Sequence, residues 1–150
     1  MDAVTYPETK VVDFITQNVI PLRIPFDSQP LSGKFQVKWT PTLIILDEEG
    51  NEHHRCVGFL GPEELIPFLM LGIGKVYFET DLLDDAAAMF EKVLSGFPQS
   101  TSVPEAIFYK GVCGYKRTHQ TGPLKEAYET LTRDFPESEW AKRAYPYRLL

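Results

Sequence analysis

The chain holds few residues whose type and spacing suit redox or metal chemistry. Its two cysteines, Cys56 and Cys113, form neither a CxxC pair nor a set with zinc-ligand spacing. We interpret both as small buried side chains, and a disulfide between them stays open. His53 and His54 are neighbours on an expected strand, so their side chains point to opposite faces and do not share a metal. The sequence thus predicts no catalytic residue, no metal site and no cofactor.

Composition and charge exclude several classes of protein. Of the 150 residues, 43% are hydrophobic and 24% are charged, as in an ordinary globular protein. The net charge of −6 disfavours electrostatic binding to nucleic acid or to anionic lipid. No apolar run approaches the roughly 20 residues of a membrane span, and the first residues lack the pattern of a secretory signal. We therefore expect a cytoplasmic protein with no nucleic acid partner and no membrane partner.

Residues 1–69 predict an alternation of helices and strands. Strands are expected over 19–26, 42–46 and 52–59, and the short turn between the last two makes them an antiparallel hairpin. The continuous apolar run at 42–46 is typical of a strand buried on both faces. A loop with a short helix is expected over 30–38.

Two helix starts are expected in the same part of the chain. Thr5 and Glu8 have the spacing of a capping box, which predicts a helix beginning there. Gly61 precedes a second helix with proline and acidic residues in its first turn. Pro67 is expected to bend that helix or to mark a strained turn.

Residues 70–150 are expected to be helical throughout and contain an internal repeat. Residues 90–100 match residues 128–138 at an offset of 38, and their shared Phe-Pro pairs lie at 97–98 and at 135–136. A period in this range indicates stacked helical repeats.

The repeat resembles the tetratricopeptide family. Gly74-x-x-Tyr77, Ala86-x-x-x-Phe90 and Pro98 occur at the spacings of that family's pattern. Small Gly74 and Ala86 would let two helices approach closely, with Tyr77 and Phe90 filling the space between them. The resemblance implies an array of paired helices that offers a concave surface to a protein or peptide partner.

The sequence departs from that family's pattern at several positions. Met70 stands where the family has tryptophan, and Ile73 where it has leucine. In the looser second unit, Gly111 takes the glycine position but Leu124 replaces the small alanine. Residues 140–150 would form the first helix of a third, incomplete unit that caps the array.

The first half resembles a thioredoxin-like domain that lacks its first strand and its CxxC motif. Trp39-Thr40-Pro41-Thr42 precedes a buried strand, a hairpin and a final helix, as it does in that family. The resemblance implies a cis bond between Thr40 and Pro41 and backbone pairing with an extended substrate segment. We therefore expect Trp39, Thr40 and Pro41 to be binding residues.

Aromatic residues recur through the second half at the spacing of a repeat core. The favoured interpretation is a packed core, and a ligand groove formed by the outward-facing members is the alternative. These residues are Tyr77, Phe78, Phe90, Phe108, Tyr109, Tyr115 and Tyr128.

The expected fold is an α/β thioredoxin-like domain, truncated at its N-terminus, over 1–69, followed by all-α tetratricopeptide-like repeats over 70–150. The expected function is non-catalytic protein or peptide binding through the repeat surface. The alternative is a thiol–disulfide oxidoreductase whose CxxC lies upstream of Met1. Because the missing strand leaves 19–26 and 42–46 with unpaired edges, we also expect a homo-oligomer formed by strand exchange or edge pairing.

Overall fold

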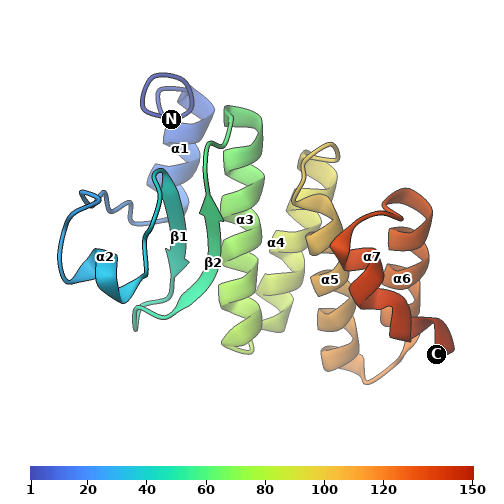
Figure 1. Ribbon diagram of the computed structural model, residues 1–150. Coiled ribbons are helices and arrows are strands. Elements are labelled where there is room, and N and C mark those ends of the chain that lie inside the picture. The colour runs from blue at the N-terminus through green and yellow to red at the C-terminus, as the bar shows by residue number, and fades with distance from the viewer. The chain divides into compact units, whose positions relative to one another are not determined.

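The computed structural model describes all 150 residues (Figure 1). The chain is mostly helical, with one antiparallel sheet of two strands. Its contacts divide it into two units, Met1–Ile66 and Pro67–Leu150. The elements are α1 (Thr9–Asn18), α2 (Leu31–Lys34), β1 (Thr42–Leu46), β2 (Glu52–Val57), α3 (Pro62–Glu79), α4 (Leu83–Gly96), α5 (Val103–Thr118), α6 (Gly122–Asp134), α7 (Glu139–Ala144) and a 3₁₀ helix (Tyr145–Leu149). None of the helices combines the length and the apolar character that a membrane span requires.

The predicted hairpin is present in the first unit. Strands β1 and β2 pair antiparallel, with Thr42 opposite Val57 and Leu46 opposite Glu52. The expectation that β1 is buried on both faces is wrong, because its residues are only partly buried and Leu46 is exposed. A strand is buried on both faces only where other elements pack over both faces of its sheet, and the partly exposed side chains of β1 lack such cover.

The strand expected over 19–26 does not form. The segment is extended but belongs to no sheet, and Ile20 and Leu22 are 97% and 77% exposed. Pro21 and Pro25 have no N–H group and so remove donors from one edge. An apolar, β-prone sequence forms a strand only where a neighbouring strand pairs with it, and no strand pairs with this segment.

The capping role expected of Thr5 is also wrong. Helix α1 begins at Thr9, and Glu8 occupies the N-cap position without a side-chain cap bond. The Thr5 hydroxyl instead donates to the carbonyl oxygen of Leu60 at 2.7 Å, and the Thr5 residue is fully buried. Thr5 thus forms a long-range hydrogen bond to Leu60 instead of a capping bond at the start of α1.

Helix α3 continues without interruption through Pro67, where the sequence predicted a bend or a strained turn (Figure 1). Pro67 is fully buried, and its neighbours Ile66 and Phe68 are 5% and 6% exposed. Proline in a helix removes one backbone hydrogen bond at a cost of about 3 kcal/mol. Burial of three consecutive side chains, each worth on the order of 1.5–3 kcal/mol, offsets that loss.

The helices of the second unit pack as successive pairs. Helix α5 packs against both α4 and α6. A fully buried group that includes Ala86, Phe90 and Val93 of α4 and Ala106 of α5 forms the centre of the core. The glycines mark the closest approaches: a Cβ atom on Gly74 would lie 2.6 Å from the ring of Phe90.

The second pair of helices, α5 and α6, has a close contact that the alignment of the two repeat units does not predict. A Cβ atom on Gly111 would lie 2.6 Å from the Cβ atom of Ala127 and 2.9 Å from the carbonyl oxygen of Pro123. Leu124, which was aligned with the small alanine, is buried. Ala127 is therefore the small residue that faces Gly111 across this pair.

The chain ends in the second unit with a short helix and a 3₁₀ turn. The Ser138 side chain accepts a hydrogen bond from the N–H of Ala141 at 3.0 Å and caps α7. Ala141 and Ala144 are buried against Leu131 of α6. This segment covers the last pair of helices, as expected of residues 140–150, although only part of it is α-helical.

Candidate functional site

The three residues expected to bind a partner lie just before β1. Trp39 is 68% exposed, Thr40 is exposed and Pro41 is partly buried. The Thr40–Pro41 peptide bond is cis, and the carbonyl oxygen of Pro41 accepts a hydrogen bond from Gly58 N at 2.8 Å. The Thr42 hydroxyl donates to the carbonyl oxygen of Trp39 at 2.7 Å, which holds this segment against the start of the strand.

Both cysteines are free thiols. Burial raises the pKa of Cys56, and it raises the pKa of Cys113, which is fully buried, to about 11. The thiolate is the form that attacks a disulfide, and a raised pKa keeps the thiol protonated at neutral pH. Neither side chain has the environment of a redox nucleophile.

A buried carboxylate–imidazole pair closes the hairpin turn. Asp47 Oδ2 lies 2.9 Å from His53 Nε2, and both side chains are 7% exposed. Asn51 donates to the same carboxylate from its backbone N–H at 2.7 Å and from its amide at 2.9 Å. The hydrogen bond from His53, followed by those from Asn51, holds the pKa of Asp47 well below its usual range. The Asp47 carboxylate is thus already bonded to Asn51 and His53. No group of His, Cys, Asp and Glu side chains is arranged to hold a metal ion.

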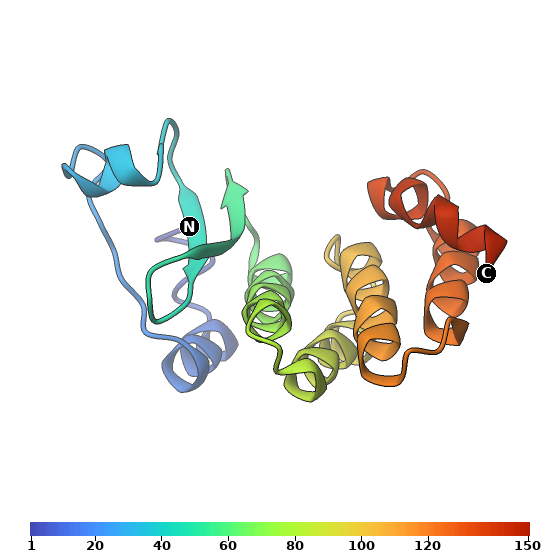
Figure 2. The same ribbon diagram turned by 90° about the horizontal axis from the view of Figure 1, so that it is seen from below.

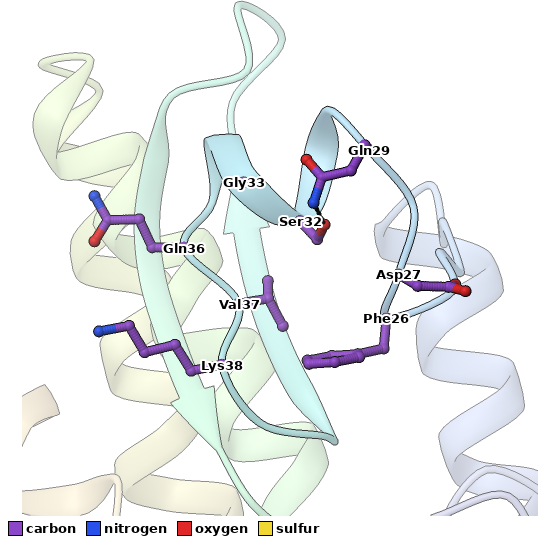
Figure 3. A pocket seen from close by; sticks show the side chains of 8 residues that line it. All are labelled: Phe26, Asp27, Gln29, Ser32, Gly33, Gln36, Val37 and Lys38. Carbon is purple, nitrogen blue, oxygen red and sulfur yellow. Dashed lines mark hydrogen bonds between the residues drawn. The ribbon is translucent and has the colours of Figure 1, made fainter.

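A cavity of about 490 Å³ lies in the first unit between the segment at 26–29 and the segment at 32–38. Its lining combines polar side chains, among them those of Gln29 and Ser32, with two apolar side chains, Phe26 and Val37, which point toward one another (Figure 3). Gln29 donates to the Ser32 hydroxyl at 2.9 Å, so the amide of Gln29 already has a hydrogen-bond partner within the chain.

The second unit carries a continuous line of aromatic rings, which we call the aromatic row: Phe78 of α3, Tyr109 of α5 and Trp140 of α7. The Phe78 and Tyr109 ring centroids are 5.3 Å apart in an edge-to-face arrangement, and those of Tyr109 and Trp140 are 5.7 Å apart. Phe108 extends the row, since it lies 5.2 Å from Trp140 and 5.9 Å from Tyr147. The row therefore crosses three helices.

These helices lie on the same side of the second unit. In the view of Figure 2, α3, α5 and α7 run along one side and α4 and α6 along the other. The three ring-bearing residues are partly buried, in contrast to Phe90 of α4, which is fully buried. The aromatic row is thus at the surface that the first helices of successive pairs share.

Charged side chains accompany the aromatic row. Lys75 Nζ lies 3.0 Å from Glu105 Oε1, with both side chains 14% exposed, and 5.5 Å from the centroid of the Tyr109 ring. The Arg143 guanidinium lies 4.9 Å from the Trp140 ring centroid. Burial, followed by the nearby Glu105 and Glu79 carboxylates, raises the pKa of Tyr109. The surface so formed offers aromatic faces, a cation and carboxylates within a short span.

The sequence indicated part of this site. Phe78, Phe108 and Tyr109 belong to the aromatic set whose outward members were the alternative groove, but Trp140 was expected only as the start of a capping helix. Its ring contacts link α7 to the row. Phe78, Tyr109 and Trp140 follow one another at a constant spacing of 31 residues, and that regularity was the available signal.

No family model matches the chain, and no curated protein and no solved structure matches it either.

Proposed function

We propose that this chain is a non-catalytic binding module, in which tetratricopeptide-like repeats bind a segment of a partner protein and follow a thioredoxin-like domain that lacks its first strand and CxxC motif. The observation that carries the proposal is the aromatic row on α3, α5 and α7. The face formed by these helices is the proposed docking surface.

The row has the composition of a protein-binding surface. Aromatic rings provide large contact area with little side-chain entropy to lose, and aromatic and arginine residues are enriched where binding energy concentrates. The ring pairs Phe78–Tyr109 and Tyr109–Trp140 hold these side chains in place before a partner arrives. Preorganisation of this kind reduces the entropy cost of association.

The polar groups beside the row provide selectivity. Lys75 Nζ lies 3.0 Å from Glu105 Oε1, and both side chains are mostly buried. A partner segment that brings its own carboxylate or amide can exchange with this pair, while a segment without such groups leaves the pair intact. Aromatic contact combined with paired charges favours a peptide with apolar anchors and a few polar groups over a small molecule.

The thiols support a non-catalytic function. Exchange of a disulfide needs an accessible thiolate, and burial raises the pKa of both Cys56 and Cys113. The carboxylate of Asp47, the other group with a strongly shifted pKa, is committed to the hairpin turn.

A peptide library screened against the full chain tests the proposal. Peptides selected on the unmodified protein are titrated against the double variant Lys75→Ala/Glu105→Ala, whose changes lie beside the aromatic row. The matched control is Lys110→Ala/Glu91→Ala, which removes an ion pair of 2.6 Å between α5 and α4 whose members are about half exposed. We expect at least about tenfold weaker binding in the first variant and unchanged binding in the control. Equal affinity in both variants would contradict the proposed surface.

A further inference from the structure

A second cavity of the first unit, of about 420 Å³, is lined mainly by charged side chains, and we call it the basic cavity. Its lining comes from the end of α2, from the loop that follows α2 and from β2. In that loop, Gln36 and Lys38 point away from Phe26 and Val37 (Figure 3). The residues that line the basic cavity are Lys34, Phe35, Gln36, Lys38, Glu52 and Arg55.

Positive charge is concentrated in this cavity, although the first unit is acidic. Residues 1–66 contain ten acidic side chains and five basic ones, which are Lys10, Arg23, Lys34, Lys38 and Arg55. Three of the five basic side chains line the cavity, whereas only one of the ten acidic side chains, that of Glu52, does so. Cations gathered in a hollow raise the local concentration of anions there.

The Arg55 guanidinium is held in place by hydrogen bonds at two of its three nitrogen atoms. Its Nε donates to Glu52 Oε1 at 2.6 Å, and its Nη2 donates to Glu52 Oε2 and, at 2.7 Å, to the carbonyl oxygen of Phe35. The third nitrogen, Nη1, donates no hydrogen bond within the chain. Because a guanidinium is planar and rigid, the two N–H groups of Nη1 are donors with a fixed position.

Glu52 neutralises Arg55 but leaves the charges of the two lysines uncompensated. The hydrogen bond from Arg55 lowers the pKa of Glu52, so both members of this pair are charged at neutral pH. Neither Lys34 nor Lys38 forms an ion pair. Lys34 Nζ lies instead 5.1 Å from the centroid of the Phe35 ring. The lining as a whole therefore matches an anion with two negative charges.

A phosphate monoester has the charge and the acceptors that these donors require. Near neutral pH it carries almost two negative charges, and it has three strong acceptor oxygens. A carboxylate carries one negative charge and would leave one of the two lysine charges uncompensated. The cavity is also larger than a phosphate group alone, because its volume lies in the range of about 300–1,000 Å³ that is typical of small-molecule sites.

We propose that the basic cavity binds a small organic phosphate monoester, whose phosphate group accepts hydrogen bonds from Lys34, Lys38 and Arg55. The organic part of the ligand lies against the Phe35 ring, which is the one aromatic side chain of the lining. The site belongs to the first unit and does not depend on the aromatic row. It adds small-molecule binding to the proposed function, and either proposal can fail without the other.

Titration of phenyl phosphate into the full chain, followed by the NMR shifts of the backbone amides, tests the site. At about pH 7.5 this probe is mainly a dianion, because its second pKa is about 6. We expect saturable shifts at residues 34–38 and 52–55. Phenyl sulfate has the same shape with one negative charge and is expected to bind roughly threefold to fivefold more weakly. Inorganic phosphate, which lacks the ring, is also expected to bind more weakly than phenyl phosphate.

The contribution of the lysines is tested by the variant Lys34→Gln/Lys38→Gln. We expect it to bind phenyl phosphate on the order of tenfold more weakly, because it lacks the two uncompensated charges. Lys34→Arg/Lys38→Arg keeps both charges and is expected to retain binding. The control Lys92→Gln/Lys125→Gln makes the same change in net charge at exposed positions of α4 and α6, and is expected to bind as the unmodified chain does.

Four results would overturn the proposal. One is the absence of saturable shifts at residues 34–38 and 52–55. Another is equal affinity for phenyl sulfate and phenyl phosphate, which would show that the second negative charge is not recognised. The third is equal affinity for inorganic phosphate and phenyl phosphate, which would show that the cavity recognises no organic part. The last is an equal loss of affinity in the two glutamine variants, which would reduce the effect to the net charge of the chain.

Discussion

A Cβ atom placed on Gly74 would lie 2.6 Å from Cε1 of Phe90 and 3.0 Å from its Cδ1. This distance sets how closely α3 can approach α4, because the Phe90 ring is fully buried and has no free space into which to turn. The first helix pair thus depends on the lack of a side chain at one position and on a large ring at the other.

Gly74→Ala is expected to destabilise the chain by about 1–3 kcal/mol, because the added methyl group overpacks the contact with Phe90. Gly96→Ala is the control, since a Cβ atom there would meet nothing within 4 Å. In α4 that change is expected to stabilise by about 0.5–1 kcal/mol through helix propensity. Urea unfolding followed by circular dichroism measures both. Equal shifts of the same sign in the two variants would contradict the packing described here.

Thr5→Val removes a hydroxyl donor while it keeps the shape of the side chain. The carbonyl oxygen of Leu60 would lose its 2.7 Å hydrogen bond in a buried position, so we expect a loss of about 1–3 kcal/mol in the first unit. Thr16→Val is the matched control, because the Thr16 hydroxyl is exposed and bonds only within its own helix. Amide exchange of the β1 and β2 residues reports on the stability of this unit. A Thr5→Val protein as stable as Thr16→Val would show that the hydrogen bond contributes nothing.

The stability of the hairpin is expected to depend on pH through Asp47. Its pKa is lower in the folded chain than the ordinary value of about 3.9, so the carboxylate contributes stability that is complete above that pH. The contribution is lost as the pH falls below about 3.9 toward the lower folded-state pKa. Amide exchange in the hairpin, measured from pH 6 downward, should show a smaller loss of protection for Asp47→Asn than for the unmodified chain. The control Glu49→Gln, in the same turn, should follow the unmodified chain; if Asp47→Asn followed it too, the pair with His53 would not be stabilising.

The thiols are expected to react slowly in the folded chain. Cys113 is fully buried with a pKa of about 11, so at pH 8 a Cys56→Ser protein should react with a thiol reagent only after unfolding. Cys56 is partly buried and should react before Cys113 does. Reagent absorbance with and without urea makes the comparison. Rapid labelling of Cys113 in the folded state would contradict its placement in the core.

The sequence predicted the helices of the second unit well because their signals are local. The Phe-Pro pairs at 97–98 and 135–136 stand at the ends of α4 and α6, and Gly74 and Phe90 meet as their spacing indicated. Ala127 was missed because the offset of 38 aligns Leu124, three positions earlier, with the alanine of the first unit. A repeat alignment cannot place such a shift without the helix contacts.

The first unit was harder to predict because its interactions are not local. The apolar residues at 19–26 resemble a strand, but pairing depends on a neighbour that the segment does not have. The Thr5 hydroxyl bonds to Leu60, which is far away in the sequence, so the local capping pattern was misleading. The Asp47–His53 pair lies next to a register shift between Ile45 and Leu46, which no local pattern in the sequence predicts.

Fluorescence of Trp140 tests the central claim most directly, because one tryptophan lies in each unit and Trp140 belongs to the aromatic row. In a Trp39→Phe chain, titration with a library-selected peptide is expected to change the emission of Trp140 with the same dissociation constant that calorimetry gives. In a Trp140→Phe chain the remaining Trp39 should not respond to that peptide. A response from Trp39 alone, or a peptide that binds without changing the emission of Trp140, would contradict binding at the face of α3, α5 and α7.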